Sequence, residues 1–250
     1  MPAPAAPKEP DPSETRVAAV KQVLDTKLAQ YGGTWSATYI DLERGRDVTV
    51  NDEKLVAASL VKLYIMLAVF DGIEHDTITD DANVDALLKQ MITVSSNEAA
   101  NGLLSRIGNG EAAIATVTAT AQRYGFTSSE ELRTLTGMAS GNAVENWTST
   151  RDCGSFLSQV YAGTLVSKNA SERMMQLLLG QTRRTKIPAG VPSGVKVANK
   201  TGELAAVQND VAIVFGTHPY VLAVMSSDIS SAVAPSQITE LSRAVWDAAQ

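Results

Sequence analysis

Hydrophobic residues recur along this chain with two different periods, and the period changes twice. At residues 13–31, apolar residues fall on one stripe with helical spacing, and a pair of glycines follows where a C-terminal cap is expected. Strand-like alternation follows at residues 34–43 and 48–51, with the turn RGRD between them. The first part of the chain therefore predicts an amphipathic surface helix and then an antiparallel hairpin.

The middle of the chain has helical character. Helices are predicted at residues 60–73, 83–91, 97–107, 111–124, 150–165 and 171–179, joined by short polar links. Strand character returns after Pro192, at residues 195–200, 209–216 and 220–227, and a helix from Ser236 closes the chain. The two ends of the chain therefore supply one sheet.

These patterns predict an α/β (α+β) fold. We expect an antiparallel five-stranded sheet flanked by the N- and C-terminal helices and packed against an all-helical lobe, which meets the edge of the sheet and leaves a cleft. The predicted organisation is a disordered Pro-rich tail and a single domain, with these boundaries: tail 1–14, domain 15–250, sheet lobe 15–56 plus 190–250, and helical lobe 57–189.

Composition excludes several classes of function. The net charge of -6, from 21 basic and 27 acidic residues, is spread without a basic block, so a nucleic-acid partner is not expected. The apolar run at residues 60–70 is interrupted by Lys62 and is too short to cross a bilayer. His75, His218 and Cys153 lack the spacing of metal ligands, so neither a metal nor a cofactor is expected.

The pair Ser59 and Lys62 is the first candidate for chemistry. The two residues stand three apart at the predicted start of a helix, so the hydroxyl and the ammonium can share a proton. A hydroxyl is a poor nucleophile near neutral pH, and a lysine can activate it where burial lowers the lysine pKa. Apolar residues flank Lys62 on both sides, so we expect it to be buried. Alone, this spacing also arises by chance in a chain of this length.

Two further clusters follow in the sequence. Ser95 and Asn97 stand at a loop-to-helix junction, where a hydroxyl could pass a proton and an amide could hold a substrate, although a plain N-cap is the simpler reading. Lys200, Thr201 and Gly202 end a predicted strand and could bind a carboxylate, with the glycine allowing close approach of a ligand. The order and context of all three clusters together point to acyl transfer.

The three clusters resemble the motif set of class A β-lactamases and penicillin-binding proteins, which is Ser-x-x-Lys, then Ser-x-Asn, then Lys-Thr-Gly. The segment SSNEAANGLL is most similar to the class A side, and the resemblance runs from Val17 to the C-terminus. It implies the same helical lobe and antiparallel sheet. The resemblance also implies that Ser59 is the nucleophile, Lys62 its activator and Ser95 the proton shuttle. It implies that the substrate is contacted by Asn97, Lys200, Thr201, Gly202 and Glu203. The backbone N–H of Glu203 would form an oxyanion hole with the backbone N–H of Ser59.

The sequence departs from that family in the loop that positions the deacylating water. Glu130 or Glu131 is near the expected place of the catalytic glutamate, and we take Glu131 as the candidate, but neither is followed by the asparagine of the family pattern. Glu203 also places an acid beside the presumed carboxylate dock, and the strand that follows supplies no arginine. Both features are expected to weaken affinity for anionic β-lactams.

The expected function is a serine hydrolase of the class A β-lactamase type, with a small-molecule β-lactam or D-alanyl peptide as substrate. Two alternatives stay open: a D-alanyl-D-alanine peptidase or esterase, and a penicillin-acylated sensor that deacylates poorly. Five of the nine prolines lie in the first twelve residues, and this segment resembles a tether to the cell envelope, so we expect an exported protein. The alternative is an ordinary disordered terminus of a cytosolic protein. We also expect a monomer.

Overall fold

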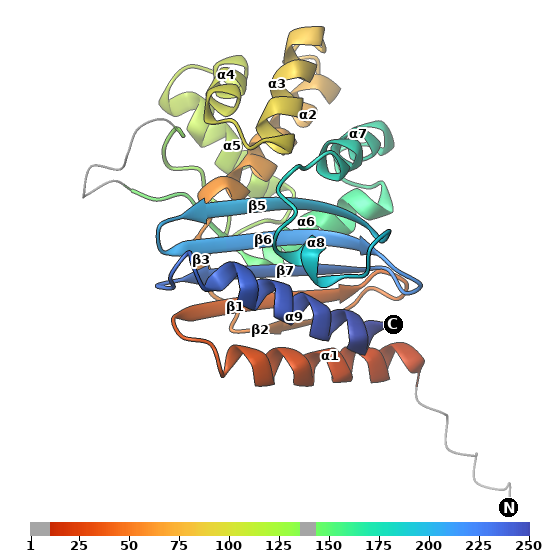
Figure 1. Cartoon of the computed structure of the whole chain (residues 1–250). Helices are drawn as coiled ribbons and strands as arrows, with labels where there is room; N and C mark the ends of the chain where they lie inside the picture. Colours follow the sequence, from red (N-terminus) through yellow and green to blue (C-terminus); the bar gives the residue numbers. More distant parts are fainter. Residues whose placement is uncertain (1–10, 136–143) are drawn as a thin grey trace, which may run out of the picture.

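A five-stranded antiparallel sheet forms the centre of the computed structural model, which describes residues 11–135 and 144–250 (Figure 1). The strand order is β2-β1-β7-β6-β5, and every neighbouring pair is antiparallel. The strands are β1 (Thr34–Asp41), β2 (Arg46–Val50), β5 (Lys196–Leu204), β6 (Val207–Phe215) and β7 (Tyr220–Ser227). Both ends of the chain supply this sheet, so the predicted fold class is confirmed.

Two terminal helices cover one face of the sheet. Helices α1 (Pro12–Leu28) and α9 (Ala234–Ala249) pack on each other, with the short α8 (Ile187–Gly190) against α9 (Figure 1). Alternate residues of β6 and β7, such as Ala212 and Leu222, join their core. The first turn of α1 begins at Pro12, earlier than predicted, because Asp11 caps it by accepting a hydrogen bond from the backbone of Ser13. Residues 1–10 of the expected tail lie outside the described residues.

The opposite face of the sheet carries the helical lobe. The strand residues between those of the first face, such as Val211, Ile213 and Ala223, belong to the second core, and α6 (Thr150–Ala162) packs across β1, β6 and β7. The lobe does contact the edge strand β5, as predicted, but the prediction missed that it also covers this face of the sheet. The physical reason is that the central strands are apolar on both faces, and each face needs a cover.

Helix α2 (Lys62–Glu74) runs through the middle of the lobe. All its residues from Lys62 to Gly72 are buried, which explains why its sequence is apolar all round. The other helices surround it: α3 (Ala82–Thr93), α4 (Asn97–Ile107), α5 (Glu111–Arg123) and α7 (Lys168–Leu179). A second, two-stranded sheet of β3 (Lys54–Val56) and β4 (Trp147–Ser149) was not predicted, because three-residue strands leave too little alternation to detect.

Within the described ranges, none of the helices has the length and apolar character needed to cross a membrane. The same part of the chain contains no group of three or more histidine, cysteine or acidic side chains that could hold a metal ion.

Candidate active site

Ser59 lies in a turn of 3-10 helix, η1 (Ala58–Val61), that leads directly into α2. The turn is anchored from two sides, because the Ala57 N–H donates to the Asn146 carbonyl at 2.8 Å and the Asn209 amide donates to the Ala57 carbonyl at 3.2 Å. Ala58, directly before the serine, has a φ of 47°, which is uncommon for a residue with a side chain. Such strain persists only where the surroundings fix it, and it is found often at functional sites.

The Lys62 ammonium lies at the meeting point of the predicted residues. Its Nζ is 3.1 Å from Ser59 Oγ, 2.7 Å from Asn97 Oδ1, and 2.6 Å and 3.2 Å from the carbonyl and hydroxyl oxygens of Ser95. The side chain is fully buried. The structure therefore brings the first two motifs together around one nitrogen.

Burial and the charge of Arg183 lower the pKa of Lys62 to about 8. An ammonium has three N–H bonds, yet four oxygens lie within reach of Nζ. The two nearest are carbonyl-type acceptors, which take two N–H bonds and leave the third position for a hydroxyl. When Lys62 is neutral, that position is a lone pair that can accept the proton of Ser59.

Ser95 connects the second motif to the third. Its φ of 62° turns it out of the helical path, while the next residue, Ser96, is the N-cap of α4 and accepts from the Ala99 N–H. The capping role that was the simpler reading for this segment therefore belongs to Ser96. Lys200 Nζ lies 2.9 Å from Ser95 Oγ, so this hydroxyl stands between two lysines.

The third motif lies inside β5 and not at its end, since the strand continues to Leu204. Lys200 is fully buried, donates to the Thr201 carbonyl at 2.7 Å, and has a pKa well below its usual range because of burial and the neighbouring Lys62. A Cβ on Gly202 would lie 2.7 Å from the Ala57 carbonyl oxygen. The glycine therefore admits the chain's own turn around Ser59, a reason for a glycine here that the sequence did not indicate.

Glu203 pairs with two cations that the sequence reading missed. Arg183 forms an ion pair with one carboxylate oxygen, and Lys186 Nζ is 2.9 Å from the other. Although burial acts in the opposite direction, the charges of Lys186 and Arg183 lower the pKa of Glu203 below its usual range. Arg183 therefore reaches this end of the site from the segment before β5, and not from the strand after it. The only sequence signal for these cations was the basic run RRTK at residues 183–186.

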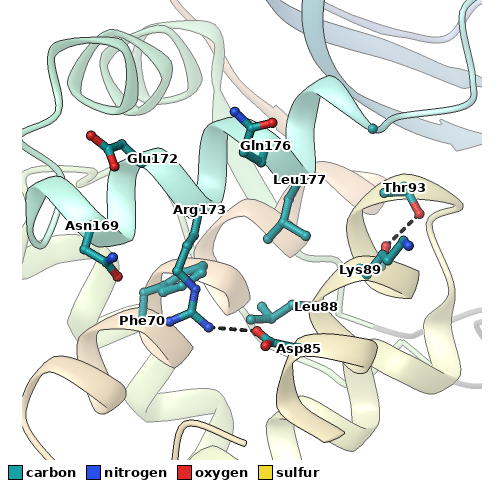
Figure 2. Close-up of a pocket in the computed structure, with 11 residues that line it drawn as sticks. Phe70, Asp85, Leu88, Lys89, Thr93, Asn169, Glu172, Arg173, Gln176 and Leu177 are labelled. Carbon is teal, nitrogen blue, oxygen red and sulfur yellow. Dashed lines mark hydrogen bonds and ion pairs between the residues drawn. The ribbon is translucent and has the colours of Figure 1, made fainter. Parts of the chain in front are cut away.

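A small cavity of about 120 Å³ opens over these groups. Its lining residues are Ala58, Ser59, Asn97, Arg133, Leu135, Glu145, Asn146, Glu203 and Leu204. A larger groove of about 600 Å³ lies between α3 and α7, where Arg173 stands between Phe70 and Asp85 (Figure 2). The lining of the larger groove includes no serine or cysteine, so the smaller cavity is the candidate active site.

The sequence profile of the Beta-lactamase enzyme family matches residues 17–86 and 79–249. The chain belongs to that family. Among curated proteins, none matches this chain. Its fold is similar to a β-lactamase from Chitinophaga pinensis (20% identity, TM-score 0.84, 92% of this chain and 99% of that one). It is also similar to a β-lactamase from Sphaerobacter thermophilus (23%, 0.78, 94% and 97%) and to a mutant of PBP-A solved as an acyl-enzyme complex with penicillin G (22%, 0.79, 97% and 98%).

The chain is a β-lactamase-like serine hydrolase. Glu130 and Glu131 are the two candidates for a deacylating base. Glu130 is unsuited to this role, because its carboxylate pairs with Lys54 at 2.7 Å and its backbone pairs with Trp147. Glu131 is buried, and neither of its carboxylate oxygens has a hydrogen-bond partner among the described residues. Burial raises the pKa of Glu131 to about 8, although the charges of Arg133 and Lys62 oppose the shift.

Asn146 is the third residue that the sequence reading missed. Its side-chain oxygen accepts from the backbone N–H groups of Leu132 and Arg133 at 2.8 and 3.0 Å, and its side-chain nitrogen donates to the Arg133 carbonyl at 3.1 Å. Its own carbonyl accepts from Ala57 beside the nucleophile turn. Asn146 therefore joins the Glu131 segment to the Ser59 segment. No local pattern announces this role, because the two segments meet only in the folded chain.

Proposed function

We propose that the chain is a class A-type β-lactamase that forms an acyl-enzyme on Ser59 and hydrolyses β-lactam amides. The observation that carries the proposal is the position of Lys62 Nζ, within 3.2 Å of both the Ser59 and Ser95 hydroxyls, with a pKa of about 8. About one Lys62 in ten is then neutral at pH 7 and able to accept a proton. That fraction is large enough for a general base.

Acylation follows from this arrangement. Neutral Lys62 takes the hydroxyl proton of Ser59 as Oγ forms a bond to the carbonyl carbon of the β-lactam. The oxyanion is placed at the backbone N–H groups of Ser59 and Glu203, two residues that line the same cavity. Ser95 then passes a proton from Lys62 to the leaving nitrogen as the carbon–nitrogen bond breaks.

Deacylation is assigned to Glu131. The ionised carboxylate removes a proton from a water molecule, whose oxygen attacks the acyl carbon. The ester bond to Ser59 Oγ then breaks, and the proton passes from Glu131 to this oxygen. Its pKa of about 8 leaves about one Glu131 in ten ionised at pH 7, so hydrolysis of the acyl-enzyme is slow at neutral pH.

A second candidate function is a penicillin-binding peptidase or sensor that is acylated and retains the adduct. The specific observation in its favour is that Glu131 is absent from the residues that line the cavity around Ser59. The two candidates share acylation on Ser59 and differ only in the lifetime of the adduct.

An intact-mass time course with excess benzylpenicillin tests the proposal, with drug hydrolysis followed in the same tube. We expect an adduct with the mass of the drug, or drug loss, in the wild type and neither in Ser59→Ala. Ser105→Ala is the matched control, because this exposed serine on α4 lies outside the cavity, and it should react like the wild type. Adduct formation in Ser59→Ala would contradict the nucleophile assignment, and a persistent wild-type adduct would favour the second candidate.

Export to the cell envelope and a monomeric state are part of the same proposal. The proline-rich start of the chain and membership of the Beta-lactamase enzyme family support export.

A further inference from the structure

An acidic side chain lies inside the cavity that contains the nucleophile. Glu203 lines this cavity together with Ser59, and its side chain is 30% exposed. Its two carboxylate oxygens are divided between two cations, Arg183 and Lys186. The two cations that contact this lining residue are therefore already paired with a carboxylate that belongs to the protein.

Contacts of the Arg183 backbone and of the buried Lys186 side chain fix the positions of these two residues. The backbone N–H of Arg183 donates to the Gln181 side chain at 2.9 Å, and the Asn199 side chain donates to the backbone carbonyl of Arg183 at 3.2 Å. Gln181 is itself fixed, since its amide donates to a carbonyl at the end of α3 at 2.7 Å. Lys186 is almost fully buried and also donates to the Asn209 carbonyl at 3.1 Å. The pairing with Glu203 is thus built into the backbone on either side of it.

The cations at this end of the cavity have partners in the protein before any substrate arrives. Arg183 and Lys186 pair with Glu203, and Lys186 also lies near the buried Asp210, whose oxygens accept from the Asn199 side chain and the Ile187 N–H at 2.9 Å each. Lys200, the remaining cation here, already donates to Ser95 and to the Thr201 carbonyl. In the part of the chain that the structure describes, each of these three cations therefore has an oxygen partner.

We propose that Glu203 is a specificity-determining residue: its carboxylate occupies the guanidinium of Arg183, the exposed cation that would otherwise bind a carboxylate of the substrate. The preferred acyl donor is then an amide or ester with no free carboxylate beside the scissile bond. This inference rests on the proposed acylation of Ser59. An anionic donor must either displace Glu203 from Arg183 or lie beside a like charge, and both options slow its acylation.

The test compares two donors that differ only in this charge, benzylpenicillin and its methyl ester. Second-order acylation rate constants are measured by intact mass for the wild type and for Glu203→Gln, and the readout is the ratio of the anion's constant to the ester's. Glutamine keeps the shape and an oxygen for Lys186 while it releases Arg183. We expect this ratio to rise at least tenfold in Glu203→Gln.

A double variant and a matched control sharpen the test. Adding Arg183→Gln to Glu203→Gln should cancel most of the gain, because the freed guanidinium is what binds the substrate carboxylate. Glu172→Gln removes an exposed charge of α7 that lies outside this cavity, and should leave the ratio unchanged.

Two results would overturn the inference. Equal changes for both donors in Glu203→Gln, or a gain of the same size in Glu172→Gln, would show that Glu203 does not select against a carboxylate. Absence of acylation by either donor in every variant would instead overturn the proposed function, and the inference would fall with it.

Discussion

The Ser59 centre and the Glu131 segment lie near each other but are organised differently. Lys62 has four oxygen atoms within hydrogen-bond distance, and Ser95 is contacted by two lysines. Glu131 is just as buried, yet both its carboxylate oxygens lack a partner among the described residues. The groups proposed for acylation are thus fixed before substrate binds, whereas the proposed deacylating group has only its burial.

This difference separates the two chemical steps. A carboxyl group without hydrogen-bond partners in an apolar place keeps its proton, and a protonated carboxyl cannot act as a base. We therefore expect fast formation of the acyl-enzyme and slow loss of it near neutral pH.

The largest expected effect comes from removing Lys62. Lys62→Met fills the same space without a base, and acylation by benzylpenicillin should fall about 10²- to 10⁴-fold, the usual contribution of a positioned base. The measurement is the acylation rate constant by intact mass, with thermal unfolding of the same samples. Lys89→Met, an exposed lysine on α3, should keep the wild-type rate.

A Lys62→Met protein that is folded and acylated at the wild-type rate would contradict the assignment of Lys62 as the base for Ser59. The proton of Ser59 would then have to go to another group.

A smaller effect is expected on stability when Glu131 is replaced by glutamine. The pKa of Glu131 is raised from 4.5 to about 8 in the folded chain, so between these values the folded chain holds one proton more than the unfolded chain. The stabilisation is complete below about pH 4.5 and is lost as the pH rises through about 8, with a slope of about 1.4 kcal/mol per pH unit. Urea unfolding at pH 5, 6 and 7 should show that the free energy of unfolding of Glu131→Gln, relative to that of the wild type, increases with pH by this slope. Parallel curves for the two proteins would mean that Glu131 is ionised when buried.

The sequence predicted the parts of the fold and site that depend on local pattern. The strands of the main sheet follow from alternation, and the Ser59–Lys62 pair follows from helical spacing, which needs no tertiary contact. The apolar flanks of Lys62 correctly indicated its burial. The union of Ser95 with Lys200, 105 positions apart, was anticipated only through the resemblance to a family.

The missed features all depend on contacts between distant segments. Arg183 reaches Glu203 because Gln181 and Asn199 hold its backbone, and Asn146 bridges two loops through backbone groups. The contact of Gly202 with the turn at Ala57 was missed because a glycine in a strand does not reveal what approaches it. The cover on the second face of the sheet was misplaced for a similar reason, since helical periodicity does not say where a helix packs.

The most direct test of the account is the pH dependence of deacylation. The acyl-enzyme is formed with benzylpenicillin, free drug is removed, and the decay of the adduct is followed by intact mass between pH 5 and pH 9. With Glu131 as the base, the decay rate constant should rise about tenfold per pH unit up to pH 7 and level off above about pH 8, and Glu131→Gln should abolish this rise. A rate constant independent of pH, or the same profile in Glu131→Gln, would contradict the account.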